Sequence, residues 1–188
     1  SEAHTQKPFV KYWLHNEWIL VDGKKMSKSL GNFYNLKDIT KKGFNPLELR
    51  YFFLSKIYNQ KLNFTWNELE SSRISYQRLK NILSEIKDDN TLKGTRKINN
   101  IYLKEFEDAM DDNLNTPRAL QVLWKLVRDK NGIGKYKTIE KMDDVLGLDL
   151  LKEEKIFIPE NIKKLVQDRE QARKDKDWKK ADQIRERI

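Results

Sequence analysis

The sequence predicts a mainly α-helical fold that starts with a short strand-and-loop region. Convincing strand signals occur in residues 9–22, where aromatic and aliphatic runs lie on either side of His15-Asn16-Glu17. From residue 35 onward, apolar residues recur at helical spacing between capping residues. Hydrophobic residues make up 38% of the chain and charged residues 36%, a composition rich in helix formers. We therefore expect a hairpin or two short strands, followed by an α-helical bundle.

The strand region is expected to lead into a loop at residues 24–32. Asp22-Gly23 is a turn pair that ends the second strand, and Gly31-Asn32 lets the chain turn out of the loop. Such a loop is attached firmly at its ends and mobile in its middle, as a lid over a ligand must be.

Capping residues divide the rest of the chain into helices. Residues 35–42 predict a short helix that stops at Gly43, and Asn45-Pro46 opens another that runs to about Ile57. Thr65 is the expected cap of a long helix over 66–88, with a buried stripe of Leu69, Ser72, Tyr76, Leu79, Leu83 and Ile86. Further helices are expected over about 98–112, 116–130 (capped by Thr116), 138–147 and 158–174, and a last helix is expected after a break at 175–177. A loop near 88–94 precedes the first of these, and an irregular stretch at 148–157 precedes the helix over 158–174. The inward residues of these helices would be Ile101, Phe106, Ala109, Met110, Leu120, Leu123, Trp124, Val127, Ile162, Leu165 and Val166, and the helical spacing continues with Trp178, Ala181, Ile184 or Arg185, and Ile188.

The charge balance favours a polyanionic partner. Lys and Arg total 38 against 29 Asp and Glu, which gives a net charge of +9. An ordinary Lys-rich protein is the alternative, because the sequence alone does not place its cations on one face. The cations that would line an RNA-facing surface are Arg73, Arg78, Lys80, Lys87, Arg118, Lys125, Arg128 and those of residues 163–187. The absence of Cys excludes disulfides and thiolate metal sites, and no apolar run is long enough to span a membrane.

The most informative segment is Lys25-Met26-Ser27-Lys28-Ser29, followed by Leu30-Gly31-Asn32. Two mobile ammonium groups and two hydroxyls in one loop suit a phosphate chain that gains negative charge as it leaves. Met26 is expected to hold the loop by packing, because a thioether cannot bind phosphate. Asn32 either fixes the turn or caps the next helix. The competing interpretation of the whole segment is a solvated basic loop.

The order of Lys25 to Ser29 is identical to the KMSKS signature of class I aminoacyl-tRNA synthetases, and the flanks resemble cysteinyl-tRNA synthetase. The resemblance covers almost the whole chain. It rests on Ser1-Glu2-Ala3, Lys7-Pro8-Phe9-Val10, Tyr12-Trp13-Leu14-His15-Asn16, Val21-Asp22-Gly23, residues 25–33, Asp108-Ala109-Met110-Asp111-Asp112, Asn115-Thr116-Pro117 with Ala119-Leu120, and Lys176-Asp177-Trp178 with Ala181-Asp182 and Ile184-Arg185.

The resemblance implies a cysteine–tRNA ligase that uses ATP with Mg²⁺ to make cysteinyl-adenylate and then charges tRNA(Cys). Lys28 and Lys25 would be the catalytic residues that stabilise departing pyrophosphate, within an ATP-binding set of Lys25, Met26, Ser27, Lys28 and Ser29. The implied domains are the end of a Rossmann-type catalytic domain (1–43), a connecting region (44–65), a helical tRNA-contacting bundle (66–150) and the start of an anticodon-contacting unit (151–188). A cytoplasmic enzyme, monomeric and without a membrane partner, is expected.

The same comparison predicts that part of the enzyme lies outside this sequence. No His-x-Gly-His motif occurs, and the histidines are His4 and His15. The Zn²⁺ ligands of the family would precede Ser1, so no metal ligand is assigned here. We therefore expect this chain alone to be catalytically inactive.

Two other functions remain open. A related ligase joins cysteine to an amino-sugar, and a basic helical module could bind RNA without catalysis. Among the other candidate residues, His15 is expected to be packed between strands, and the carboxylates of Asp108, Asp111 and Asp112 to be solvated or to cap a helix. Most tryptophans are expected in the core, with Trp178 the best candidate for stacking on a base.

Overall fold

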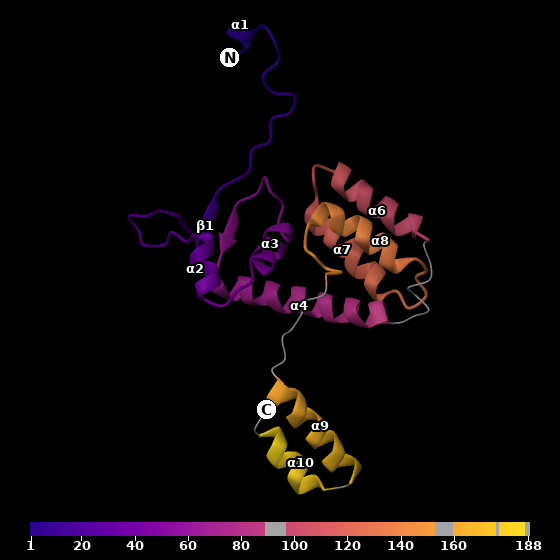
Figure 1. Cartoon of the computed structure of the whole chain (residues 1–188). Coiled ribbons are helices and arrows are strands. Elements are labelled where there is room, and N and C mark those ends of the chain that lie inside the picture. The colour runs from indigo at the N-terminus through magenta and orange to yellow at the C-terminus, as the bar shows by residue number, and fades with distance from the viewer. Residues whose placement is uncertain (89–96, 153–159, 176, 187–188) are drawn as a thin grey trace. The chain divides into compact units, whose positions relative to one another are not determined.

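The structure is a computed structural model that describes residues 1–88, 97–152, 160–175 and 177–186. Helices dominate it, and a small three-stranded sheet lies near the N-terminus (Figure 1). The chain divides into two compact units, Ser1–Leu151 and Lys152–Ile188. The predicted fold class, a short strand-and-loop region joined to an α-helical bundle, is confirmed, although the third strand follows two helices along the chain. No helix within the described ranges is long and apolar enough to cross a membrane.

The sheet has the order β2-β1-β3, formed by β1 (Ile19–Val21), β2 (Lys24–Lys25) and β3 (Leu62–Phe64). β1 pairs antiparallel with β2 through a two-residue turn, in which Asp22 and Gly23 have φ values of 49° and 75°. An Asp-Gly pair with both φ values positive is what a tight hairpin requires. β1 pairs in parallel with β3, so this segment far along the chain completes the sheet.

The predicted strand at the start of residues 9–22 is wrong. Residues 9–17 form neither helix nor strand, and the partner of β1 in the hairpin follows it. Phe9, Tyr12, Trp13 and Leu14 are 63–81% exposed, because no described element covers them. The prediction of a strand in this segment rested on its aromatic and aliphatic content alone. β3 was not predicted, because three residues are too few to show an alternating pattern.

The predicted helix starts beside the sheet are confirmed. After the four-residue α1 (Glu2–Thr5), Asn35 caps α2 (Leu36–Lys41) and Asn45 caps α3 (Pro46–Leu54), each with a reciprocal acidic partner three residues later. α3 ends at Leu54 and not at Ile57. The Thr65 hydroxyl accepts a hydrogen bond from the Glu68 N–H, 3.1 Å away, at the start of α4 (Trp66–Asp88).

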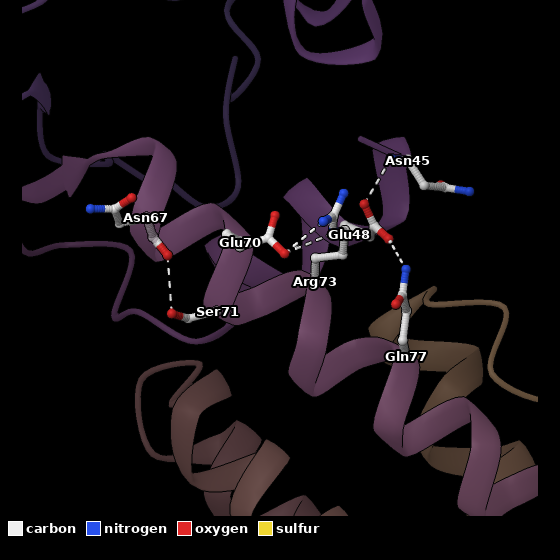
Figure 2. Close-up of polar contacts among 7 residues, drawn as sticks. All are labelled: Asn45, Glu48, Asn67, Glu70, Ser71, Arg73 and Gln77. Carbon is white, nitrogen blue, oxygen red and sulfur yellow. Dashed lines mark hydrogen bonds and ion pairs between the residues drawn. The ribbon is translucent and has the colours of Figure 1, made fainter. Parts of the chain in front are cut away.

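A buried carboxylate joins α3 to α4 (Figure 2). Glu48 is only 4% exposed; it accepts from the Asn45 N–H and from the Gln77 Nε2 of α4, both at 2.9 Å. Glu48, which completes the N-terminal cap of α3, therefore also bonds α3 to α4. A buried carboxylate is tolerated because both oxygens are satisfied.

Three helices pack beside α4 to form the bundle: α6 (Asn100–Asp111), α7 (Thr116–Arg128) and α8 (Lys135–Leu146). The buried stripe predicted for α4 is confirmed, although Ile86 is only partly buried. Three details differ from prediction. Asn115, not Thr116, caps α7, whose second residue is Pro117; α8 begins at Lys135; and Ile101 is 72% exposed, because it lies on the outer side of α6.

Two hydrophobic cores share α3 and α4. Phe52 of α3 and Leu69 of α4 belong to the core beneath the sheet, with Val21, Ile39, Leu62 and Phe64. Tyr51 and Tyr76 of the same two helices belong to the core of the bundle. The strand region and the bundle are therefore parts of one folded unit.

The second unit is a helical hairpin of α9 (Glu160–Lys174) and α10 (Trp178–Arg185), with Ala172, Ala181 and Ile184 buried. Val166 is 41% exposed, so the prediction that it points inward is wrong, and Trp178 is 60% exposed. Several predictions lie outside the described residues: the loop at 89–94, the irregular stretch at 153–157, the helix start at Ile158-Pro159, Lys176 and Ile188, and the side chains of Lys87 and Lys163.

Candidate functional site

The predicted loop leaves the sheet at β2 and rejoins the fold at α2. Lys24 and Lys25 lie in β2, and residues 26–35 lead to the first turn of α2. Met26 is half-buried and packs against the core beneath the sheet, which agrees with the anchoring role expected from its thioether. Lys25 and Lys28 are exposed. One end of the loop is thus held by a strand and an apolar side chain, while its cations face solvent.

Asn32 connects the two sides of this loop. Its Oδ1 accepts a hydrogen bond from the Ser27 N–H at 2.8 Å, and its Nδ2 donates to the Lys25 carbonyl at 3.1 Å. The cap of α2 is Asn35, so of the two roles considered for Asn32 the structure shows the turn-fixing one. Between these contacts, the Ser27 and Ser29 hydroxyls lie 2.7 Å apart.

Both lysines of the loop lie over aromatic rings. The Lys25 Nζ is 4.6 Å from the ring centroid of Trp18, and the Lys28 Nζ is 5.5 Å from that of Phe33. No carboxylate of the described residues forms an ion pair with either ammonium group. A cation–π contact at an exposed site contributes about 0.5–1 kcal/mol, less than a charge-assisted bond to phosphate. The arrangement can therefore release both cations to an anionic ligand.

The predicted RNA-facing cations fall into two groups. Arg73 donates two hydrogen bonds to Glu70 (Figure 2), and Arg118 lies 3.6 Å from Asp112. The second group, Arg78, Lys125 and Arg128, lines one groove between α4, α6 and α7, although Lys125 is itself paired with Glu105. The sequence did not reveal this grouping, although residues 121, 125 and 128 follow one another at helical spacing on the side of α7 opposite its buried stripe.

The remaining candidate residues are tryptophans and His15, and of these Trp18 contacts the loop through Lys25. Trp66 packs against Tyr34, Phe44 and Phe64. Trp13 and Trp18 are 71% and 62% exposed, so the core position expected for most tryptophans is wrong for them. His15 is exposed and stacks on Trp13 rather than packing between strands.

The carboxylates of the described residues do not form a metal centre. Asp108 pairs with Lys104 at 2.9 Å, and Asp108, Asp111 and Asp112 are all exposed, as expected for solvated groups. In the described part of the chain no group of three His, Cys, Asp or Glu side chains could hold a metal ion. These residues therefore do not fit a zinc site, and we derive no catalytic step through zinc.

Three protein-family models match successive parts of the chain. Residues 1–74 match the class I (C) catalytic domain of tRNA synthetases, and residues 105–151 match the DALR domain. Residues 158–188 match the anticodon-binding domain of cysteinyl-tRNA ligase. These successive matches assign the chain to the family of class I aminoacyl-tRNA synthetases.

Individual relatives narrow the class. The chain is 37% identical to the cysteine–tRNA ligases of Chlamydia muridarum and Chlamydia pneumoniae, and 36% identical to that of Lachnospira eligens. Each comparison covers the whole chain and 43–44% of the relative. The chain belongs to the cysteine–tRNA ligase family and spans less than half the length of these relatives.

Proposed function

We propose that this chain acts as part of a cysteine–tRNA ligase, which joins L-cysteine to ATP and then transfers the cysteinyl group to the 3′ end of tRNA(Cys). The observation that carries the proposal is the Lys25–Ser29 loop. Asn32 ties its two sides together, and both of its ammonium groups are exposed. The family matches on either side of the loop support the same assignment.

The proposed role of the loop is to hold the triphosphate during activation. The cysteine carboxylate attacks the α-phosphorus of ATP, the bond to the β-phosphate oxygen breaks, and negative charge builds on the departing pyrophosphate. Lys28 and Lys25 would move from the rings of Phe33 and Trp18 to that charge. Such contacts accelerate the reaction because they are stronger in the transition state than in the substrate. Mg²⁺ would accompany ATP and offset phosphate charge.

The Ser27 and Ser29 hydroxyls are proposed to donate hydrogen bonds to the same phosphates, and Met26 to hold the loop against the core. The proposal also includes the domain limits 1–43, 44–65, 66–150 and 151–188, a cytoplasmic location and a monomeric enzyme. Zinc, if the enzyme uses it, would bind residues other than those described here.

The acceptor distinguishes this function from that of an amino-sugar ligase. The match of residues 158–188 to an anticodon-binding domain favours RNA as the acceptor, and exposed Trp178 in that segment is proposed to stack on a base. A non-catalytic RNA-binding module would not need the loop geometry described above.

The test is an assay of the full-length protein for ATP–pyrophosphate exchange with cysteine and for transfer of cysteine to two acceptors. We expect cysteine-dependent exchange, charging of a tRNA(Cys) transcript, and no ligation to the amino-sugar. Exchange followed by ligation only to the sugar would support the other ligase. RNA binding without exchange would support the non-catalytic module.

A further inference from the structure

A groove in the first unit brings together side chains from three helices. It has a volume of about 790 Å³ and is lined by side chains of α4, α6 and α7, of which α7 packs against both of the others. Its lining is basic, aromatic and polar: Ile74, Ser75, Arg78, Tyr102, Gln121, Trp124, Lys125, Arg128 and Asp129. Ile74 is 59% exposed, an apolar surface that water covers in the free protein.

The aromatic wall of the groove is fixed from behind. The Trp124 Nε1–H donates a hydrogen bond to the Tyr51 hydroxyl at 3.0 Å, and Tyr51 is buried in the bundle core. The Arg128 guanidinium lies 4.7 Å from the centroid of the Trp124 ring. Stacking on a fixed indole limits the rotamers of Arg128, so less entropy is lost when it binds an anion.

Two of the four charged groups in the groove are already satisfied. The Lys125 ammonium donates to both oxygens of Glu105 at 2.9 Å. The Asp129 carboxylate accepts from the Asn131 N–H and the Tyr102 hydroxyl, and these bonds hold its pKa below the usual value.

Arg78 and Arg128 carry the remaining charge. Both are exposed, and among the described residues neither forms an ion pair, although Arg128 stacks on Trp124. The groove therefore offers two free guanidinium groups beside an apolar surface and a fixed indole. An anion with an apolar or aromatic part fits this lining.

We propose that this groove binds the ribose–phosphate backbone of RNA, with phosphates on Arg78 and Arg128 and sugars against Ile74 and Trp124. The proposal rests on the proposed function, because tRNA is the RNA that this enzyme would bind. Planar guanidinium groups match phosphate oxygens in pairs, and such contacts position a nucleic acid without reading its bases.

Ser75 favours RNA over DNA in this groove. Its hydroxyl proton is used by the Ser71 carbonyl, to which it donates at 2.9 Å, so its oxygen is left as an acceptor. The ribose 2′-hydroxyl can donate to such an acceptor, whereas deoxyribose cannot. The exposed Gln121 amide offers both donor and acceptor atoms on the facing helix.

The test measures the affinity of the full-length protein for a tRNA(Cys) transcript as a function of salt, for wild type, Arg78→Gln and Arg128→Gln. Each substitution removes one phosphate contact, so we expect Kd to rise about five- to tenfold and the salt slope to fall by about one. Lys141→Gln is the matched control, since Lys141 is an exposed cation of the same bundle, on α8, and does not line the groove; its Kd should stay within twofold of wild type.

Further arms separate RNA from other ligands and from failed folding. DNA of the same sequence should bind the wild-type protein more weakly than the tRNA transcript does. AMP should not displace the tRNA, even at concentrations that would saturate a site for a single nucleotide. Equal Kd values and salt slopes for wild type and both arginine variants would overturn the proposal, as would an effect of Lys141→Gln equal to theirs. Thermal melting of each variant checks the fold.

The affinity of the groove for tRNA can be tested independently of amino-acid activation. Cysteine-dependent ATP–pyrophosphate exchange without tRNA should be unchanged in both arginine variants. If wild type shows no exchange but tRNA binding still depends on Arg78 and Arg128, the proposed ligase function fails and the groove stands. If exchange is normal but neither arginine substitution changes the affinity for tRNA, only the groove proposal fails.

Discussion

Replacing Asn32 with Ala should weaken catalysis far more than stability. The substitution removes the hydrogen bonds to the Ser27 N–H at 2.8 Å and to the Lys25 carbonyl at 3.1 Å, which join the two sides of the loop. Asn32 is half-buried and belongs to neither hydrophobic core. The change therefore acts on the loop and leaves the packing of the unit intact.

The size of the effect follows from the two lost bonds. Each contributes about 0.5–1.5 kcal/mol net, so the observed loop arrangement loses about 1–3 kcal/mol relative to alternatives. If Lys25 and Lys28 reach the triphosphate from this arrangement, the rate of activation falls about 5- to 150-fold, because 1.36 kcal/mol corresponds to a factor of ten. The melting temperature should change by no more than a few degrees.

The assay is cysteine-dependent ATP–pyrophosphate exchange of the full-length protein, with Asn35→Ala as the matched control. Asn35 caps α2 through the Lys37 and Asp38 N–H groups, at 2.9 and 3.2 Å, and its side chain bonds to these two residues of α2 rather than to the loop. The control should lose about 1 kcal/mol of stability and keep its exchange rate. Wild-type exchange in Asn32→Ala, or an equal loss in Asn35→Ala, would refute the reasoning.

Three further predictions concern the packing and the pH response of the first unit. Leu123→Ala should lower the free energy of unfolding by about 2–5 kcal/mol in urea, because Leu123 is fully buried in the bundle; a loss below 1 kcal/mol would contradict this core assignment. Glu48→Ala should cost about 1–3 kcal/mol, since the Asn45 N–H and the Gln77 amide lose their acceptor; unchanged stability would mean that water replaces the carboxylate. The pKa of Asp129 is lowered, so its contribution to folding stability is present above the normal pKa near 3.8 and is lost as pH falls through the folded-state pKa. Asp129→Asn should therefore flatten the acid side of a plot of stability against pH. An unchanged slope would argue against the role of Asp129.

Caps and periodicity predicted the helical part well because both are local. Asn45-Pro46 and Thr65 mark the starts of α3 and α4, and the seven-residue repeat of Leu69, Tyr76 and Leu83 gave the buried stripe. The sheet could not be predicted in the same way. β3 has three residues, and its parallel pairing with β1 depends on contacts between segments far apart in the sequence.

The candidate loop was visible in the sequence, but its geometry was not. The composition of Lys25 to Ser29 indicated phosphate chemistry, whereas the contacts of both lysines with aromatic rings and the two bonds of Asn32 appear only in three dimensions. The groove is a similar case. Its two free arginines come from different helices, and charge alone did not separate them from Arg73, which is paired with Glu70.

The most direct test of the account is cysteine-dependent ATP–pyrophosphate exchange in full-length Lys28→Ala, compared with wild type and with Lys41→Ala. Lys41 is an exposed lysine in the last turn of α2, outside the loop. We predict a loss of about 100-fold or more for Lys28→Ala, with an unchanged melting temperature, and a wild-type rate for Lys41→Ala. Unchanged exchange in Lys28→Ala would contradict the assignment of the Lys25–Ser29 loop to pyrophosphate departure.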